Sequence, residues 1–373
     1  MKKFMLTASA LMLGATAATA GGIERSTQSV GILFEEGNYA EFSLGGFRPD
    51  VSGTGLNSTA TGYNGASGDM AGDFGGPSFA LKMAVNEKLD FAVVLDSAVG
   101  ANINYPFGSG YFLQGSTATI SNTQLTAMLR YKLPENFSLI GGVRALRTSG
   151  KVSLPSVAGY TMESSKETDF GYLVGVAWEK PEIAARIALT YNSKITHDFD
   201  ANENFVHPLA GPLSFDTAFS TTIPESVNLE FQTGIAKDTL VFGSVRWVHW
   251  TQFDITPDVY TSPAYLGQTP LVDYTENTTT YTIGVGRKFN EKWSGAAILG
   301  YEKHTGTRTG NLGPTDGFRS IALAATYKVS DNVKVTGAVR YVDIGDARTN
   351  LPIDGDFSSN SGWGAGVRVG ISF

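Results

Sequence analysis

The sequence predicts an all-β membrane protein, a fourteen-stranded antiparallel transmembrane β-barrel with a short N-terminal plug. Three observations lead to this fold. Extended segments that alternate apolar with small or polar residues follow one another along most of the chain. Their connections alternate between tight turns and long polar loops. The last such segment, from Trp363 to Phe373, ends the chain on an aromatic residue.

The first residues resemble a secretory signal. Lys2 and Lys3 precede an apolar run over 4–13, and the residues at 18–20 match an A-x-A cleavage pattern. The run is too short to cross a bilayer, and no later stretch supplies about 18 uninterrupted apolar residues. We expect a cleaved signal peptide at 1–20, a hatch or plug at 21–38 and an outer-membrane barrel at 39–373. An uncleaved anchor helix is the alternative.

The amino-acid composition also favours a membrane barrel over other classes of protein. The chain has 44 Gly, 22 Phe, 15 Tyr and no Cys, with a pI near 5.2. Abundant glycine and aromatics without a collagen period fit a barrel with small lumen residues and aromatic girdles. The lack of cysteine excludes disulfides and thiolate metal sites, and the acidic balance disfavours nucleic acid as a partner.

Period-two alternation defines the expected strands, and helical periodicity is scarce. The strands are expected at 39–48, 77–85, 88–98, 117–133, 136–152, 166–179, 182–197, 213–234, 239–255, 274–289, 291–305, 315–329, 332–345 and 361–373. Tight turns are expected at 86–87, 134–135, 180–181, 236–237, 290 and 330–331, with long loops such as 49–76 and 257–273 between them. Such alternation places the turns in the periplasm and the loops outside the cell, whereas a soluble β-sandwich would lack it.

The same alternation assigns side chains to lipid or lumen. In the last strand the phase of Trp363 and Val367 faces lipid, and the phase of Arg368 faces the lumen. An arginine facing lipid near the midplane costs about 2 to 4 kcal/mol, so the charged phase must point inward. Leu240, Phe242 and Trp250 share the phase of Arg246. The arginines expected in the lumen are Arg130, Arg144, Arg186, Arg246, Arg340 and Arg368.

Several segments resemble the outer-membrane long-chain fatty acid transporter family, whose members also take up aromatic hydrocarbons. They are DSAVGANINYP at 96–106, IPESVNL at 223–229, VRWVHWTQF at 245–253, GPTDGFR at 313–319 and VRY at 339–341. The resemblance covers nearly the whole chain after the signal. It implies a monomeric fourteen-stranded barrel closed by an N-terminal hatch. It also implies passive uptake of a hydrophobic substrate, from extracellular loops to a lumen site and out sideways at a kinked third strand.

The kink is expected at Val99, Gly100, Ala101 and Asn102. Glycine inside a strand, followed by Pro106, tends to bulge or bend, although an ordinary loop start fits the spacing as well. The resemblance favours the kink. The hatch departs from the family, because Gln28-Ser29-Val30-Gly31 stands where the family carries an Asn-Pro-Ala turn. Only 21–38 precedes the first strand, so a reduced plug is expected.

A fatty acid site needs an apolar slot and a cation for the carboxylate. We expect Arg246, with Arg144 or Arg186, to pair the carboxylate and Phe242 and Trp250 to line the slot, with Arg340 as a further lumen candidate. The alternative is a structural network in which the arginines pair with Asp96, Glu230 or Glu302.

The chain is not expected to be an enzyme or to carry a metal or cofactor. Its histidines, His197, His207, His249 and His304, lie far apart and lack metal-ligand spacing. A general diffusion porin and an adhesin are the competing functions. The expected partners are a long-chain fatty acid or other hydrophobic molecule, outer-membrane lipid, and the outer-membrane assembly machinery reading Phe373.

Overall fold

The computed structural model describes residues 22–57, 62 and 65–373, so the predicted signal peptide lies outside the described residues. Eighteen strands form one sheet that closes on itself, since β1 pairs with both β3 and β23. Four pairs of consecutive segments, β4/β5, β8/β9, β10/β11 and β12/β13, each make one crossing of the wall, which leaves fourteen crossings. The predicted fourteen-stranded antiparallel barrel is confirmed.

The wall strands are β1 (Tyr39–Asp50), β3 (Phe74–Ala84), β4 (Leu89–Asp96), β5 (Ala101–Asn104), β6 (Thr117–Lys132), β7 (Phe137–Leu154), β8 (Tyr160–Ser164), β9 (Glu167–Lys180), β10 (Ala185–Asn192), β11 (Ile195–His207), β12 (Gly211–Ile223), β13 (Ser226–Ala236), β14 (Thr239–Val248), β17 (Thr278–Lys288), β18 (Trp293–Glu302), β19 (Phe318–Lys328), β20 (Val333–Ile344) and β23 (Asn360–Ser372). The remaining elements are β2 (Gly53–Gly55), β15 (Asp254–Ile255), β16 (Val272–Asp273), β21 (Ala347–Arg348), β22 (Gly355–Phe357), η1 (Gly31–Phe34), η2 (Pro134–Asn136), η3 (Pro181–Ile183), η4 (Trp250–Gln252) and α3 (Asp258–Thr261). Among the described residues, no helix is long and apolar enough to span a bilayer.

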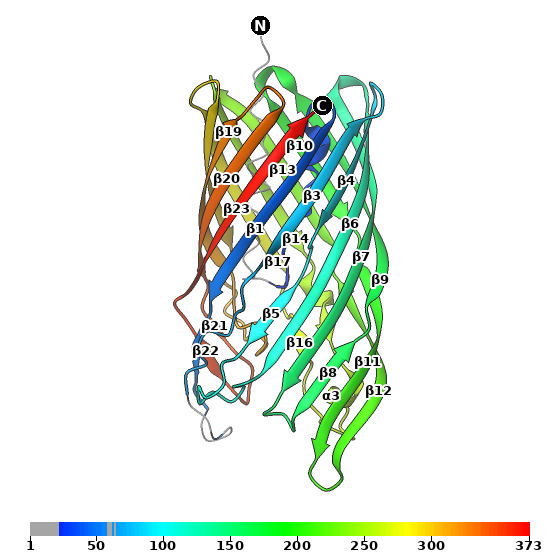
Figure 1. The fold of residues 1–373 in the computed structure, drawn as a ribbon, viewed down its shortest axis with the longest axis vertical. Coiled ribbons are helices and arrows are strands. Elements are labelled where there is room, and N and C mark those ends of the chain that lie inside the picture. The colour runs from blue at the N-terminus through cyan, green and yellow to red at the C-terminus, as the bar shows by residue number, and fades with distance from the viewer. Residues whose placement is uncertain (1–21, 58–61, 63–64) are drawn as a thin grey trace.

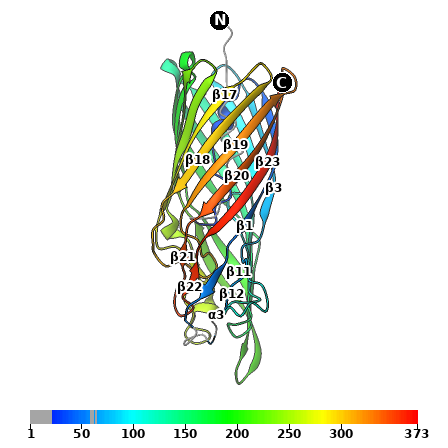
Figure 2. The ribbon, with the colours of Figure 1, turned by 90° about the vertical axis from the view of Figure 1, so that its left-hand side faces the viewer.

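The short turns lie at the end of the barrel that holds the C-terminus, and the long loops gather at the other end (Figure 1). The β11–β12 hairpin reaches beyond the other loops (Figure 2). The predicted seventh strand therefore ended too early at 197, because β11 continues to His207. Its inward residues Phe199, Ala201 and Phe205 are buried, and that apolar surface extends the hairpin.

The ninth predicted strand, 239–255, was too long. β14 ends at Val248, and the chain turns inward through η4. Trp250 is buried there, with its ring 5.9 Å from that of Phe253 and 5.1 Å from that of Tyr274. Burying three aromatic rings together in the lumen outweighs the few ladder hydrogen bonds that a longer strand would add.

The predicted faces of the wall are confirmed. In β23 the side chain of Trp363 is 62% exposed, whereas that of Arg368 is 3% exposed. The interior holds five apolar clusters of buried side chains along the barrel. Near the short-turn end, Ile32 and Leu33 of η1 are fully buried among residues of the wall. The described part of the N-terminal segment therefore lies inside the barrel.

The lipid-facing assignment predicts the effect of a charge in the middle of β7. Val143 is 62% exposed on the outer face between Phe137 and Arg147. We expect Val143→Arg to lower the free energy of unfolding by about 2 to 4 kcal/mol, because the guanidinium must leave water for hydrocarbon. Urea unfolding in lipid vesicles measures this, with Val143→Leu as the control. Equal stability of the two variants would place Val143 outside the hydrocarbon.

Candidate functional site

The third wall strand is interrupted over Ser97–Gly100, between β4 and β5. Asp96 pairs with Gln124 of β6, and pairing resumes where Ala101 faces Ile120. Four residues, 97–100, therefore stand opposite three, 121–123, which is the geometry of a β-bulge. Val99 and Gly100 lie in the interruption, and Ala101 and Asn102 begin β5.

The interruption opens a gap toward β3. The last pair between β3 and β4 is Phe79 with Leu95, so residues 74–78 of β3 pair with β1 alone. Contact across the gap resumes at Gly72, whose N–H donates to the carbonyl of Asn102 at 2.8 Å. Along the bulge, the third strand therefore has no strand pairing with β3.

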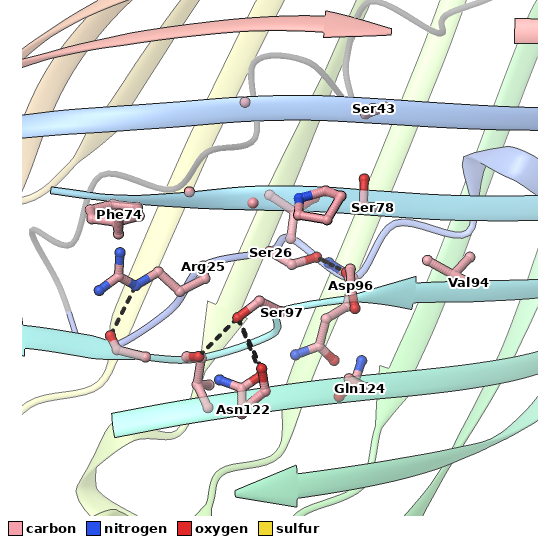
Figure 3. A pocket seen from close by; sticks show the side chains of 18 of the residues that line it. Arg25, Ser26, Ser43, Phe74, Ser78, Val94, Asp96, Ser97, Asn122 and Gln124 are labelled. Carbon is pink, nitrogen blue, oxygen red and sulfur yellow. Dashed lines mark hydrogen bonds between the residues drawn. The ribbon is translucent and has the colours of Figure 1, made fainter. Parts of the chain in front are cut away.

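A cavity of about 570 Å³ passes through this gap. Its lining includes Leu44 and Phe79, which face lipid, and Met128 and Leu173, which face the lumen. Figure 3 shows the polar rim of the cavity, with Asp96, Asn122 and Gln124 on one side and Phe74 and Arg25 at one end. The cavity therefore joins the lumen to the outer face of the barrel, and we call it the window cavity.

The N-terminal segment closes the gap from inside. The N–H of Gly100 donates to the carbonyl of Ile23 at 2.7 Å, and the N–H of Arg25 donates to the carbonyl of Ala98 at 2.8 Å. Residues 23–25 thus act as a short strand on the edge that β3 leaves unpaired. A side chain at Gly100 would bring a Cβ to 3.2 Å from both Arg25 Nε and the Ile120 carbonyl, so glycine allows the close approach.

Two side chains of the segment complete the closure. The Arg25 Nε donates to the carbonyl of Gly100 at 3.0 Å, and its guanidinium lies 3.3 Å from the centre of the Phe74 ring on β3. The Ser26 hydroxyl donates to Asp96 Oδ2 at 2.6 Å. Arg25 therefore bridges the two sides of the gap.

The carboxylate of Glu24 binds Arg246, one of the arginines predicted to hold the carboxylate of a substrate. Arg246 Nε donates to both carboxylate oxygens of Glu24, at 2.9 and 3.0 Å, and its Nη2 donates to Oε1. Its Nη1 donates to Asn228 Oδ1 at 2.6 Å. Arg144 lies within electrostatic reach of Arg246, Asp96 and Glu24. The structure thus places Arg144 and Arg246 near one another, and the carboxylate that Arg246 binds belongs to the chain itself.

The other predicted lumen residues lie elsewhere. Arg186 and Arg130 both contact the ring of Phe34, with guanidinium carbons 4.4 and 4.3 Å from the ring centre. Arg340 Nη2 donates to the Ser320 hydroxyl at 3.0 Å and faces Phe318. Arg186 is therefore part of the plug contact rather than a partner of Arg246.

The structure places Phe242 and Trp250, which we expected to line one slot, in separate clusters. Phe242 belongs to a cluster with Leu240 and Ile298, whereas Trp250 packs with Ile23, Ala98 and Val99 near the interruption. The two share an alternation phase, but the strand ends at Val248 and the chain turns between them. Of the suggested acidic partners, Asp96 lies within electrostatic reach of Arg144, and Glu230 lies within reach of Arg186 while it also accepts from Ser29 and the Val30 N–H.

Sequence reasoning did not single out Glu24, Arg25 and Ser26. They lie before the first strand, where no periodicity assigns a face. The only sign in the sequence of a role for these residues was that two charged residues follow the predicted cleavage site. That sign does not show which distant residues they contact.

The extracellular loops enclose two apolar clusters. In one, the rings of Tyr105 and Tyr111 stack at 5.3 Å, with Phe357 edge-on to Tyr111 at 6.1 Å. In the other, Tyr160 lies 4.8 Å from Tyr260 of α3. Leu312 packs against both clusters. Glu203 anchors α3, since it accepts from the Tyr160 hydroxyl at 2.8 Å and from the N–H groups of Val259 and Tyr260.

The histidines do not meet one another. His197 Nδ1 lies 2.7 Å from Asp169, His249 pairs with Glu225, and His304 pairs with Asp316. In the part of the chain that the structure describes, no three His, Asp or Glu side chains gather as metal ligands.

The closed barrel, its apolar interior and the window cavity define an outer-membrane channel that transports hydrophobic compounds. The model of the family described as outer membrane protein transport protein (OMPP1/FadL/TodX) matches residues 39–361, and the chain belongs to this family. It is a family of transport channels and not of enzymes. No curated protein matches the chain.

Solved structures with the same fold are distant in sequence. A Pseudomonas aeruginosa FadL homologue is 18% identical with a TM-score of 0.74, covering 98% of this chain and 96% of that one. The Pseudomonas putida toluene transporter TodX is 13% identical with a TM-score of 0.66, covering 97% and 96%. The Ralstonia pickettii toluene transporter TbuX is 14% identical with a TM-score of 0.63, covering 100% and 99%. At such identities the likeness concerns the fold alone.

Glu24 is expected to hold the N-terminal segment against the gap. In Glu24→Gln, the amides of Arg25, Ser26 and Gly100 should exchange hydrogen about ten to a hundred times faster, since a charge-assisted hydrogen bond contributes about 1.5 to 3 kcal/mol. Exchange in η1 should stay unchanged, because Phe34 and Glu230 hold that part. Hydrogen exchange with mass spectrometry checks this against Glu36→Gln, an exposed change in the same segment. Unaltered rates in Glu24→Gln would contradict the closure.

Acid is expected to loosen the loop at 346–359. Asp354 accepts from Arg308 at 2.7 Å and from Arg348 at 2.6 and 2.7 Å, and these bonds lower the pKa of its carboxyl from 3.8 to about 2. Because the folded pKa lies below the unfolded value, the stabilisation is complete above that value and is lost as pH falls through about 2. Pepsin cleavage of the loop should rise over this range in the wild type. In Asp354→Asn cleavage should be fast throughout, and a matching pH profile in both proteins would rule the mechanism out.

Proposed function

We propose that this chain takes up long-chain fatty acids or similar hydrophobic molecules passively. The substrate is captured among the extracellular loops, binds in the lumen, and leaves sideways at the interruption of the third strand. The observation that carries this proposal is the window cavity, whose lining includes both lumen-facing and lipid-facing residues. We assign the opening to Val99, Gly100, Ala101 and Asn102 and to the gap beside them.

The periplasmic end of the lumen supports a sideways rather than an axial exit. Ile32 and Leu33 are fully buried there, and the ring of Phe34 contacts the guanidinium groups of Arg130 and Arg186. Arg130 also donates to Glu179 and lies 3.9 Å from Asp90. An axial path would require these buried ionic contacts to separate, which is costly. The window contacts of Ile23, Arg25 and Ser26 are a few hydrogen bonds.

Arg246 and Arg144 are the proposed cations for a substrate carboxylate. Glu24 already shows that the two-pronged geometry of Arg246 accepts a carboxylate. A fatty acid that replaces Glu24 exchanges one carboxylate for another, so the arginine is never left unpaired. Release of Glu24 frees the adjoining Arg25 and Ser26 from the window. Trp250 and its neighbours Val99 and Ile23 are the proposed contacts for the alkyl chain.

A general diffusion porin is the second candidate, but the apolar clusters inside the barrel and under its long loops favour a hydrophobic substrate over a water-filled pore. Two of the related structures are titled toluene transporters, which makes neutral aromatic compounds an alternative substrate class. We also propose that the chain is exported by a cleaved signal peptide, is assembled through recognition of Phe373, and acts as a monomer.

Locking the N-terminal segment onto the window is expected to stop uptake. Ser26 and Asp96 side chains lie 2.6 Å apart, and the chain contains no other cysteine to interfere. In the double variant Ser26→Cys, Asp96→Cys, oxidation should abolish uptake of labelled oleate, and reduction should restore it. The reduced protein is the matched control. Parallel assays with toluene separate the two substrate classes. Undiminished uptake by the oxidised protein would refute lateral release.

A further inference from the structure

Five of the side chains that line the window cavity each carry a buried polar atom with no hydrogen-bond partner among the described residues. These atoms are Arg25 Nη1, Gln28 Oε1, Asp96 Oδ1, Asn122 Nδ2 and Asn192 Nδ2. An unpaired buried polar atom costs about 1 to 3 kcal/mol, and native proteins carry few of them. Five around one cavity indicate that the cavity receives a polar group.

Three of the five side chains are held in place by their other atoms. Asp96 Oδ2 accepts from Ser26 at 2.6 Å, and Asn122 Oδ1 accepts from the N–H of Ala98 at 2.9 Å. Arg25 is fixed through its Nε on the Gly100 carbonyl. Figure 3 shows Arg25, Asp96 and Asn122 around the same opening. The unpaired atoms of these three side chains are therefore preorganised, which lowers the entropy lost when a ligand binds.

The chemistry of the unpaired atoms selects the ligand. Arg25, Asn122 and Asn192 offer N–H donors, whereas Asp96 offers a carboxylate oxygen that needs a donor. An alkane satisfies none of them, and an ionised carboxylate has no hydrogen to give to Asp96. A hydroxyl group donates to Asp96 and accepts from Asn122 or Arg25 at once.

We propose that the window cavity binds the neutral, hydroxyl-bearing head group of an aliphatic amphiphile, either a fatty alcohol or a protonated fatty acid. The alkyl chain lies along the apolar lining at Leu44, Phe79, Val94 and Met128. This site rests on the proposed function and deepens it, because it names the head group that passes the window. A fatty acid held as an anion at Arg246 gives up its charge, by taking a proton from water, before it enters the window cavity.

The test measures binding of matched ligands to the full-length protein in lipid nanodiscs, with binding to empty nanodiscs subtracted. The ligands are dodecanol, its methyl ether, dodecane, and dodecanoic acid at about pH 4 and about pH 8, on either side of a carboxyl pKa. Dodecanol should bind about tenfold or more tightly than the ether, which accepts but does not donate a hydrogen bond. The acid should bind more tightly at the lower pH, and dodecanol should not change.

Asp96→Asn sharpens the test, because it keeps an acceptor for Ser26 and places an N–H₂ group where the carboxylate oxygen was. The preference for alcohol over ether should disappear in this variant and persist in Asp331→Asn, an exposed change in a periplasmic turn. The wild-type ligand series decides the matter even if Asp96→Asn fails to assemble.

Three outcomes overturn the head-group site: equal binding of alcohol and ether, tighter binding of the ionised acid, or an unchanged preference in Asp96→Asn. These outcomes differ from failure of the proposed function. If binding shows no preference but the Ser26 to Asp96 disulfide still blocks uptake, lateral transport stands and the head-group site falls. If the disulfide leaves uptake intact while the alcohol preference holds, the site stands without lateral release.

Discussion

Backbone hydrogen bonding in a bilayer is the constraint on which this architecture depends. Hydrocarbon offers no water to unpaired N–H and C=O groups, so a membrane barrel closes every ladder. The third strand breaks that rule at Ser97–Gly100, where β3 gives no partner. The N-terminal segment supplies the missing bonds at Ala98 and Gly100 from inside the barrel. Because these few bonds are local and lie outside the barrel ladder, they can open without unfolding the wall.

That arrangement couples chemistry in the lumen to the state of the wall. Glu24, Arg25 and Ser26 are consecutive, yet they contact Arg246 of β14, Phe74 of β3 and Asp96 of β4. If Arg246 exchanges Glu24 for another carboxylate, the released Glu24 can therefore move Arg25 and Ser26, the next two residues of the backbone, away from the window. The opposite end of the segment is held separately by Phe34 and Glu230. A short plug held at both ends can leave the window and stay inside the barrel.

Most of the wall could be predicted from the sequence because lipid and lumen impose a strict period of two. The last strand fixed the phase, and the alternation of turns and loops gave the number of crossings. The long-range contacts could not be predicted. Alternation assigns Arg144 and Arg246 to the lumen but not to Glu24, whose segment has no period. It also grouped Phe242 with Trp250, because a shared phase does not reveal that the strand ends at Val248. The position of the kink was suggested by Gly100 and by family resemblance together, since spacing alone fits an ordinary loop.

The two polar sites along the lumen differ in the charge they can hold. At the first site Arg246 binds the carboxylate of Glu24, and Arg144 lies within electrostatic reach of Arg246, Glu24 and Asp96. At the window the cavity lining contains two arginines, Arg25 and Arg368, and three acidic residues, Glu41, Asp73 and Asp96, so the acidic groups outnumber the basic ones. An anion is therefore stabilised at the first site and loses that advantage at the second, close to the lipid. Moving a charged group from water into hydrocarbon costs much free energy. A site at the exit that disfavours the anion therefore lowers the barrier for the substrate to enter the membrane. The sequence of charges along the lumen thus favours release of the substrate in its neutral form.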